Sequence, residues 1–181
     1  MSKKYRYFVE GECEKKLLKS MMYLEEASFH EGKVDVFNFI NEKMSNAFAR
    51  TISKDTRVVI IIDTDIKRIA LLEENISILK RITLLNDDDI ILAFSVQTLE
   101  DEIVYACSKL NNINKLFETK SVSEFKKKFI SHSNLFAKLK DAGFDINKMW
   151  ERTPQQPFDK YQNSGSKIIK KGGADRGKNQ N

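Results

Sequence analysis

The feature that most constrains this chain is a run of five β-branched residues, Val58 to Ile62, that leads directly into the acidic pair Asp63 and Asp65. A short, continuous apolar run of this kind predicts a strand buried on both faces, as in the middle of a parallel sheet. Aspartates separated by one residue on a strand point to the same side, with Cα atoms about 6.6 Å apart. A divalent cation relieves the repulsion between such carboxylates. Because aspartate is also common in turns, the pair alone favours a metal or phosphate site only slightly.

The size and composition are those of one ordinary globular domain: 181 residues, of which 41% are hydrophobic and 31% charged. A formal net charge of +5 is compatible with an anionic partner but does not identify one. Cys13 and Cys107 lie far apart in the sequence and form no ligand motif, which argues against a disulfide framework and against structural zinc. No apolar run approaches the roughly 18 residues of a membrane span. We therefore expect a cytoplasmic protein without a membrane partner.

Strand-like and helix-like segments alternate along the first two thirds of the chain. Gly32 separates the first helical segment from the strand that follows it. The alternation predicts an α/β fold with a four-stranded parallel sheet flanked by helices. The expected strands are 5–9, 34–39, 58–62 and 90–94. The expected helices are one with an apolar stripe over 17–24, followed by helices over 41–51, 69–82 and 98–110.

The remainder of the chain predicts a helical extension and a tail. Ser121 and Glu124 form a capping-box pattern at the start of one helix, and a second helix ends at Gly143. We expect Trp150 to fold back on the core. From Asp159 onward Lys and Arg outnumber Asp six to two, which is typical of a disordered basic tail. The expected organisation is a catalytic α/β domain over 1–112, a helical extension packed on it over 113–158, and a disordered tail over 159–181.

Acidic residues follow three of the four predicted strands. Glu10 ends the first strand and Glu14 lies one helical turn later, Asp63 and Asp65 end the third, and Glu100 begins the helix after the fourth. Ligands of open parallel sheets bind outside the carboxyl ends of the strands. Some of these acids also have a structural explanation: the helix dipole favours an acid such as Glu100 in a first helical turn, and Glu14 can lie on an exposed helix face beside lysines. A cluster of all five at one edge would repel itself without one or two divalent ions, and two-metal sites serve phosphoryl transfer.

The order of these motifs resembles the Toprim domain of topoisomerases, primases, recombination mediators and small nucleases. The segment from Val9 to Glu14, VEGECE, is similar to the VEGxxE form found in overcoming-lysogenization-defect (OLD) nucleases. The downstream strand with Asp63 and Asp65 stands where that family has its second acidic motif, and Thr98-Leu99-Glu100 is similar to a region of OLD-like and RloB-like proteins. The resemblance covers residues 5 to 110.

The resemblance implies a Mg²⁺- or Mn²⁺-dependent endonuclease that hydrolyses DNA or RNA, as the effector of a prokaryotic anti-phage defence system. It implies that Glu10 is a metal ligand or general acid–base, that Asp63 and Asp65 hold one ion, and that Glu14 and Glu100 complete a second metal position.

Partners and an assisting lysine are implied in the same way. The chain lacks the GxxxxGK[ST] motif of an ATPase, so a separately encoded ATPase is an expected partner beside the nucleic acid, and a homo-oligomer stays open. OLD-like nucleases also use a lysine at the site. The candidates are Lys126, Lys127, Lys128 and Lys167, among which the sequence does not choose.

Other functions explain less of the sequence. A haloacid-dehalogenase phosphatase also uses D-x-D after a strand, but Lys67 stands where that pattern has Thr or Val, and Glu10 stays unexplained. A glycosyltransferase would need a larger domain, and neither His30 nor His132 belongs to a catalytic pattern. The main alternative is a non-catalytic Toprim-fold module that binds nucleic acid or a partner ATPase.

Overall fold

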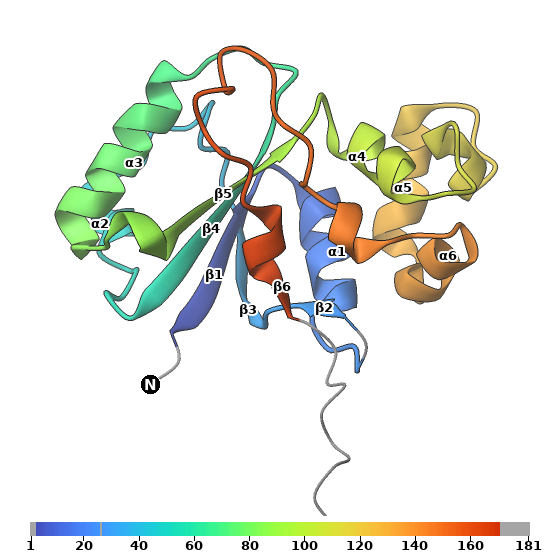
Figure 1. Cartoon of the computed structure of the whole chain (residues 1–181), viewed down its shortest axis with the longest axis horizontal. Helices are drawn as coiled ribbons and strands as arrows, with labels where there is room; N and C mark the ends of the chain where they lie inside the picture. The colour runs from blue at the N-terminus through green and yellow to red at the C-terminus, as the bar shows by residue number, and fades with distance from the viewer. Residues whose placement is uncertain (1–2, 26, 171–181) are drawn as a thin grey trace, which may run out of the picture.

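A four-stranded parallel sheet forms the centre of the protein (Figure 1). The computed structural model describes residues 3–25 and 27–170. The sheet has the order β3-β1-β4-β5, and each neighbouring pair runs parallel. Its strands are β1 (Lys4–Val9), β3 (Gly32–Val36), β4 (Thr56–Asp63) and β5 (Ile90–Ser95). The predicted α/β fold is therefore confirmed.

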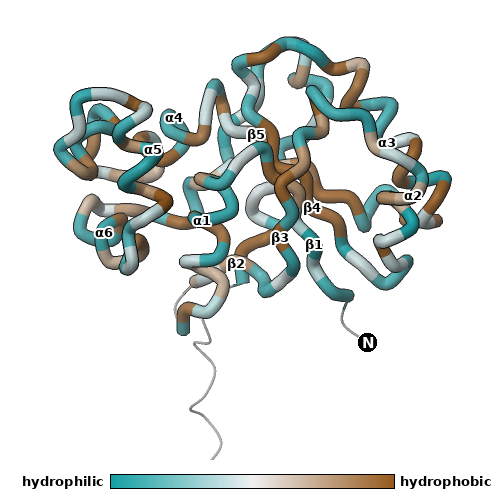
Figure 2. The backbone as a smooth tube through the Cα atoms, turned by 180° about the vertical axis from the view of Figure 1, so that it is seen from behind, coloured by the Kyte–Doolittle hydropathy of each residue, from teal (hydrophilic) through white to brown (hydrophobic). Residues whose placement is uncertain are grey.

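The β-branched run explains why β4 lies inside the sheet. Val59 and Ile61 pack into the core on one face, whereas Val58, Ile60 and Ile62 pack into the core on the other. All five side chains are buried, which confirms a strand covered on both sides. Figure 2 shows this apolar centre as the brown strands between more polar helices.

Helices cover both faces of the sheet. Apolar residues of α1 and α4 belong to one core, and apolar residues of α2 and α3 belong to the other (Figure 1). These helices are α1 (Glu12–Met21), α2 (Asn46–Ala49), α3 (Ala70–Thr83) and α4 (Leu99–Ala106). No helix within the described residues combines the length and the apolarity that crossing a membrane requires.

The helix expected over 41–51 is much shorter in the structure, where α2 spans only Asn46–Ala49. The residues before it form a loop whose backbone is hydrogen-bonded to a buried asparagine side chain. Asn75, which is fully buried in α3, accepts a hydrogen bond from the Met44 N–H at 2.7 Å. Its Nδ2 donates to the carbonyls of Phe39 and Glu42. These bonds satisfy the backbone of the loop in an irregular conformation, so the helix begins only after its N-cap Ser45.

The C-terminal extension packs against α1 and α4. It contains α5 (Val122–Ser131), α6 (Leu135–Asp141) and the 3₁₀ helices η2 (Ile113–Leu116) and η3 (Ile146–Lys148); a further 3₁₀ turn, η1 (Asp87–Asp89), precedes β5. Trp150 is fully buried, as expected. Its backbone N–H donates to the buried carboxylate of Glu102 at 2.8 Å, and its indole N–H donates to Ser95 Oγ at 3.2 Å.

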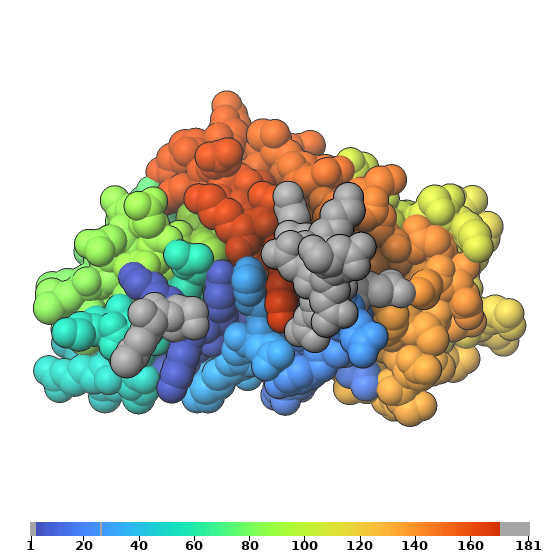
Figure 3. Space-filling model, turned by 60° about the horizontal axis from the view of Figure 1, so that its bottom comes forward, coloured from blue at the N-terminus to red at the C-terminus, as the bar shows by residue number. Residues whose placement is uncertain are grey.

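The prediction of disorder from Asp159 onward is wrong for residues 159–170. Asn163 hydrogen-bonds both the N–H and the carbonyl of Phe94, so it acts as a partner for the edge strand β5. Ile168 is fully buried. The segment forms η4 (Gly165–Ile168) and β6 (Ile169–Lys170), and β6 pairs antiparallel with β2 (Ser28–Phe29). Figure 3 shows it in red, lying against blue N-terminal segments. Residues 171–181 of the predicted tail lie outside the described residues.

Candidate functional site

The carboxyl ends of β1 and β4 bring Glu10 and Asp63 into direct contact. The two strands are parallel neighbours in which Phe8 pairs with Ile60, so the residues that follow meet at one edge of the sheet. Glu10 Oε1 accepts a hydrogen bond from the backbone N–H of Asp63, with an N···O distance of 3.0 Å. The prediction that these distant acids meet at the same edge is confirmed.

Asn38 fixes the second oxygen of the Glu10 carboxylate. Its Nδ2 donates to Glu10 Oε2 at 3.0 Å. Its Oδ1 accepts hydrogen bonds from the amides of Ile40 and Asn41, so the Asn38 side chain is itself held in place. Glu10 is therefore oriented through both oxygens, one from the neighbouring strand β4 and one from the loop after β3.

Burial and mutual repulsion favour protonated carboxyl groups at this edge. Burial raises the pKa of Glu10 to about 7; Glu14 and Asp65 raise it further, whereas its hydrogen bonds from Asp63 and Asn38 lower it. Burial likewise raises the pKa of Asp63 to about 8, and Glu14 and Glu10 add to the rise. Within the described chain, the buried Asp63 Oδ1 has no hydrogen-bond partner. Such an oxygen is a natural ligand for a cation or a proton.

A network of backbone contacts holds the loop that carries Asp65. The Thr64 N–H points to the carbonyls of Ser95 and Gln97, at 3.1 and 2.9 Å, and the Asp65 N–H donates to the Gln97 carbonyl at 3.1 Å. Gln97 adopts a left-handed conformation with φ of 77°, which is uncommon for a side chain of this type. The backbone of Asp65 is thus fixed at the carboxyl edge, while its side chain is exposed.

Glu14 and Glu100 form the other half of the cluster, together with Lys126 from the extension. Glu14 in α1 and Glu100 in α4 are 6% and 8% exposed. Burial raises the pKa of Glu14, and the charge of Glu100 adds to the rise. Lys126 Nζ lies 3.1 Å from Glu100 Oε1, as an ion pair without hydrogen-bond geometry. Burial lowers the pKa of Lys126, but its interaction with Glu100 reverses the effect and raises the pKa overall.

The structure places two residues, Lys126 and Asn38, at the site that the sequence alone could not assign to it. Lys126 is the candidate lysine that reaches the carboxylates, whereas Lys128 pairs with Glu124 at 3.5 Å. Only the docking of α5 on α1 distinguishes them. Asn38 was not predicted at all. Its signal was an amide between two phenylalanines at the end of a predicted strand, on the edge where the acids were expected.

The carboxylate oxygens at this edge are the kind of ligand that a hard divalent cation prefers, but the side chains are not arranged around a common point. Within residues 3–25 and 27–170, no group of three or more His, Cys, Asp or Glu side chains is arranged to hold a metal ion. Mg²⁺ typically uses one or two carboxylates together with waters and substrate phosphates. Asp63, with its unpartnered oxygen, and Asp65 meet that requirement beside Glu10. A second metal position at Glu14 and Glu100 stays a prediction, because Lys126 already offsets part of their charge.

Comparisons of this chain with protein-family models, with curated proteins and with solved structures find no match.

Proposed function

We propose that this protein is a divalent-metal-dependent nuclease of the Toprim type, which hydrolyses phosphodiester bonds in DNA or RNA. The observation that carries the proposal is the hydrogen bond from the backbone N–H of Asp63 to the Glu10 carboxylate, between two partly buried acids whose pKa values are raised. Catalytic groups commonly show such perturbed pKa values, because their chemistry needs a protonation state that can change near neutral pH.

Each residue of the site has a chemical role in this proposal. Glu10, with a pKa near 7, can both accept and donate a proton at neutral pH. The hydrogen bonds that its two oxygens accept hold the carboxylate in one orientation. Asp63 and Asp65 would hold Mg²⁺ or Mn²⁺, which supplies positive charge at the scissile phosphate when bound. The ion would also lower the pKa of the acids that touch it. Lys126 supplies a positive charge beside Glu100.

The cellular setting belongs to the same proposal. By resemblance to small OLD-like and RloB-like proteins, we propose a cytoplasmic effector of anti-phage defence that acts with a separately encoded ATPase. The alternative is a non-catalytic module that binds nucleic acid or that ATPase. It is favoured by one observation, namely that the described residues contain no assembled group of metal ligands.

A cleavage assay separates the two functions. The purified protein is incubated with plasmid, single-stranded DNA and tRNA, each with Mg²⁺, Mn²⁺ or EDTA. We expect metal-dependent cleavage that is lost in Asp63→Ala and retained in Asp88→Ala, an exposed aspartate that precedes β5 at the other edge of the sheet. A folded protein that binds nucleic acid equally with metal and with EDTA, and never cuts it, would support the module instead.

A further inference from the structure

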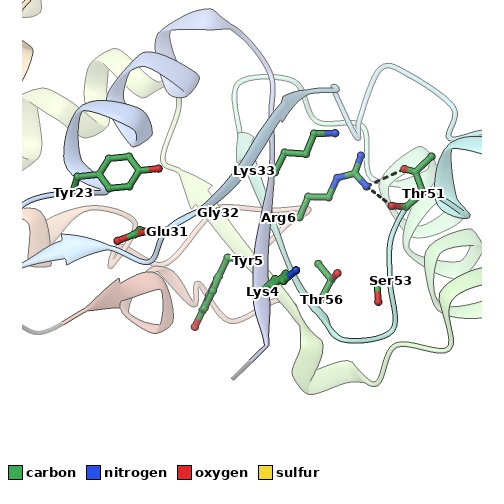
Figure 4. Close-up of a pocket in the computed structure, with 10 residues that line it drawn as sticks. All are labelled: Lys4, Tyr5, Arg6, Tyr23, Glu31, Gly32, Lys33, Thr51, Ser53 and Thr56. Atoms are coloured by element: carbon green, nitrogen blue, oxygen red, sulfur yellow. Dashed lines mark hydrogen bonds between the residues drawn. The ribbon is translucent and has the colours of Figure 1, made fainter. Parts of the chain in front are cut away.

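A cavity lies at the edge of the sheet opposite the carboxylate cluster, where β1, β3 and β4 begin (Figure 4). Its volume of about 530 Å³ is in the range of small-molecule sites. Lys4 opens β1 and Glu10 follows its end, so the extended strand separates the two sites by about 20 Å. A ligand in this cavity would therefore not touch the acids.

One end of the cavity presents an anchored guanidinium. Arg6 is only 7% exposed, and its Nε donates to Asp35 Oδ2 at 2.7 Å. Its Nη1 donates to the carbonyl and the hydroxyl of Thr51, both at 2.9 Å, as Figure 4 shows. Arginine has five N–H donors, and no hydrogen bond from Nη2 is found within the described residues. This rigidly held group leaves donors available at the cavity.

Two lysines and two further hydroxyl groups extend this donor-rich end. Lys4 is exposed and makes no ion pair with the residues that the structure describes. Lys33 is bound to Asp35 at 3.0 Å, and the hydroxyls of Ser53 and Thr56 complete the lining. The positive charges here outnumber the negative ones even when Asp35 is counted. Flexible ammonium groups, a fixed guanidinium and hydroxyls together suit a phosphate group.

The other end of the cavity is aromatic. Tyr23 is 74% exposed, an unusual position for a large ring. Tyr5 lies near it and stacks on His30, with ring centroids 4.4 Å apart and planes 7° apart, so its orientation is fixed. Glu31, between the two tyrosines in Figure 4, offers an acceptor for an amino group. With an exposed ring at one end and basic side chains at the other, the cavity offers a base a surface to stack on and its phosphate a cationic partner.

We propose that this cavity binds a nucleotide unit, with its phosphate at Lys4, Arg6 and Lys33 and its base against Tyr23. The unit is either a free mononucleotide or the phosphorylated end of a nucleic-acid strand, because both present the same base and phosphate. The site is independent of the proposed nuclease activity, since it uses none of the acidic residues at the opposite edge.

Isothermal titration calorimetry in EDTA tests the site without engaging the carboxylate cluster. The probes are AMP, adenosine, and a tetranucleotide with and without a 5′-phosphate. We expect AMP or the phosphorylated tetranucleotide to bind at least tenfold more tightly than its unphosphorylated counterpart. A preference for AMP identifies a free nucleotide as the ligand, and a preference for the tetranucleotide identifies a strand end.

Substitutions locate the binding. Lys4→Ala and Tyr23→Ala, both at exposed side chains, should each weaken it by about 5- to 10-fold. The matched controls are Lys115→Ala, an exposed lysine of η2, and Leu84→Ala, an exposed apolar residue, which should leave the affinity unchanged. The proposal is overturned if no probe binds, if the phosphate makes no difference, or if the controls weaken binding as much as Lys4→Ala and Tyr23→Ala do.

Discussion

Replacing Asp63 with asparagine should stabilise the metal-free protein at neutral pH. Burial, followed by the charges of Glu14 and Glu10, raises the pKa of Asp63 from 3.8 to about 8. The folded protein therefore binds this proton more tightly than the unfolded chain does, and the contribution of Asp63 to the free energy of unfolding falls as the pH rises from about 4 to about 8. Each pKa unit corresponds to about 1.4 kcal/mol. Asparagine keeps the size of the side chain but carries no charge at any pH.

The expected gain at pH 7 is about 2–4 kcal/mol, with the upper figure corresponding to about three pKa units. The lower figure allows for protons that the neighbouring acids take up when Asp63 ionises. At pH 5, about 1.2 units above the ordinary pKa of aspartate, the same substitution should raise the free energy of unfolding by only about 0.8–1.7 kcal/mol. Urea unfolding in EDTA at both pH values measures the difference, with Asp88→Asn as the exposed control. A gain that is equal at the two pH values, or a destabilisation at pH 7, would refute the reasoning.

Three further expectations follow from the same contacts. At 100 times the wild-type Kd, Mg²⁺ should raise the free energy of unfolding of the wild type by about 2.7 kcal/mol, but that of Asp63→Asn by about 1.4 kcal/mol or less; equal shifts in a thermal melt would contradict this. Arg152→Ala should destabilise the protein by about 3 kcal/mol, because fully buried Glu102 would lose an ion pair of 2.5 Å; a loss near zero in urea unfolding would count against it. Lys126→Met should slow cleavage much more than Lys127→Met does, without a matching loss of thermal stability; equal rates in the two variants would exclude a role for Lys126.

The sequence was sufficient where local pattern and topology act together. The run from Val58 to Ile62 has no polar position that could face water, so it had to lie inside a sheet. Parallel strands then place their carboxyl ends on one edge, which is why Glu10 and Asp63 could be assigned to the same site from their positions alone. Their contact requires no knowledge of how the helices pack.

The sequence was insufficient where side chains from distant segments replace regular structure. Asn75 satisfies the loop before α2, and Asn163 pairs with the edge strand β5. The hydrogen-bond partners of these two amides cannot be predicted from residue spacing or hydrophobic periodicity. The polar composition after Asp159 predicted disorder, whereas the buried side chain of Ile168 packs that segment onto the rest of the protein. The choice of Lys126 depends on the packing of α5 against α1, which no local pattern specifies.

The most direct test of a cation site shared by these acids is Mn²⁺ binding, measured by isothermal titration calorimetry on the metal-free protein. We expect one tight ion whose affinity falls at least tenfold, or about 1.4 kcal/mol, in both Glu10→Gln and Asp63→Asn but not in Asp88→Asn. Equal affinity in all four proteins, or no binding by the wild type, would contradict a metal site at the carboxyl ends of β1 and β4.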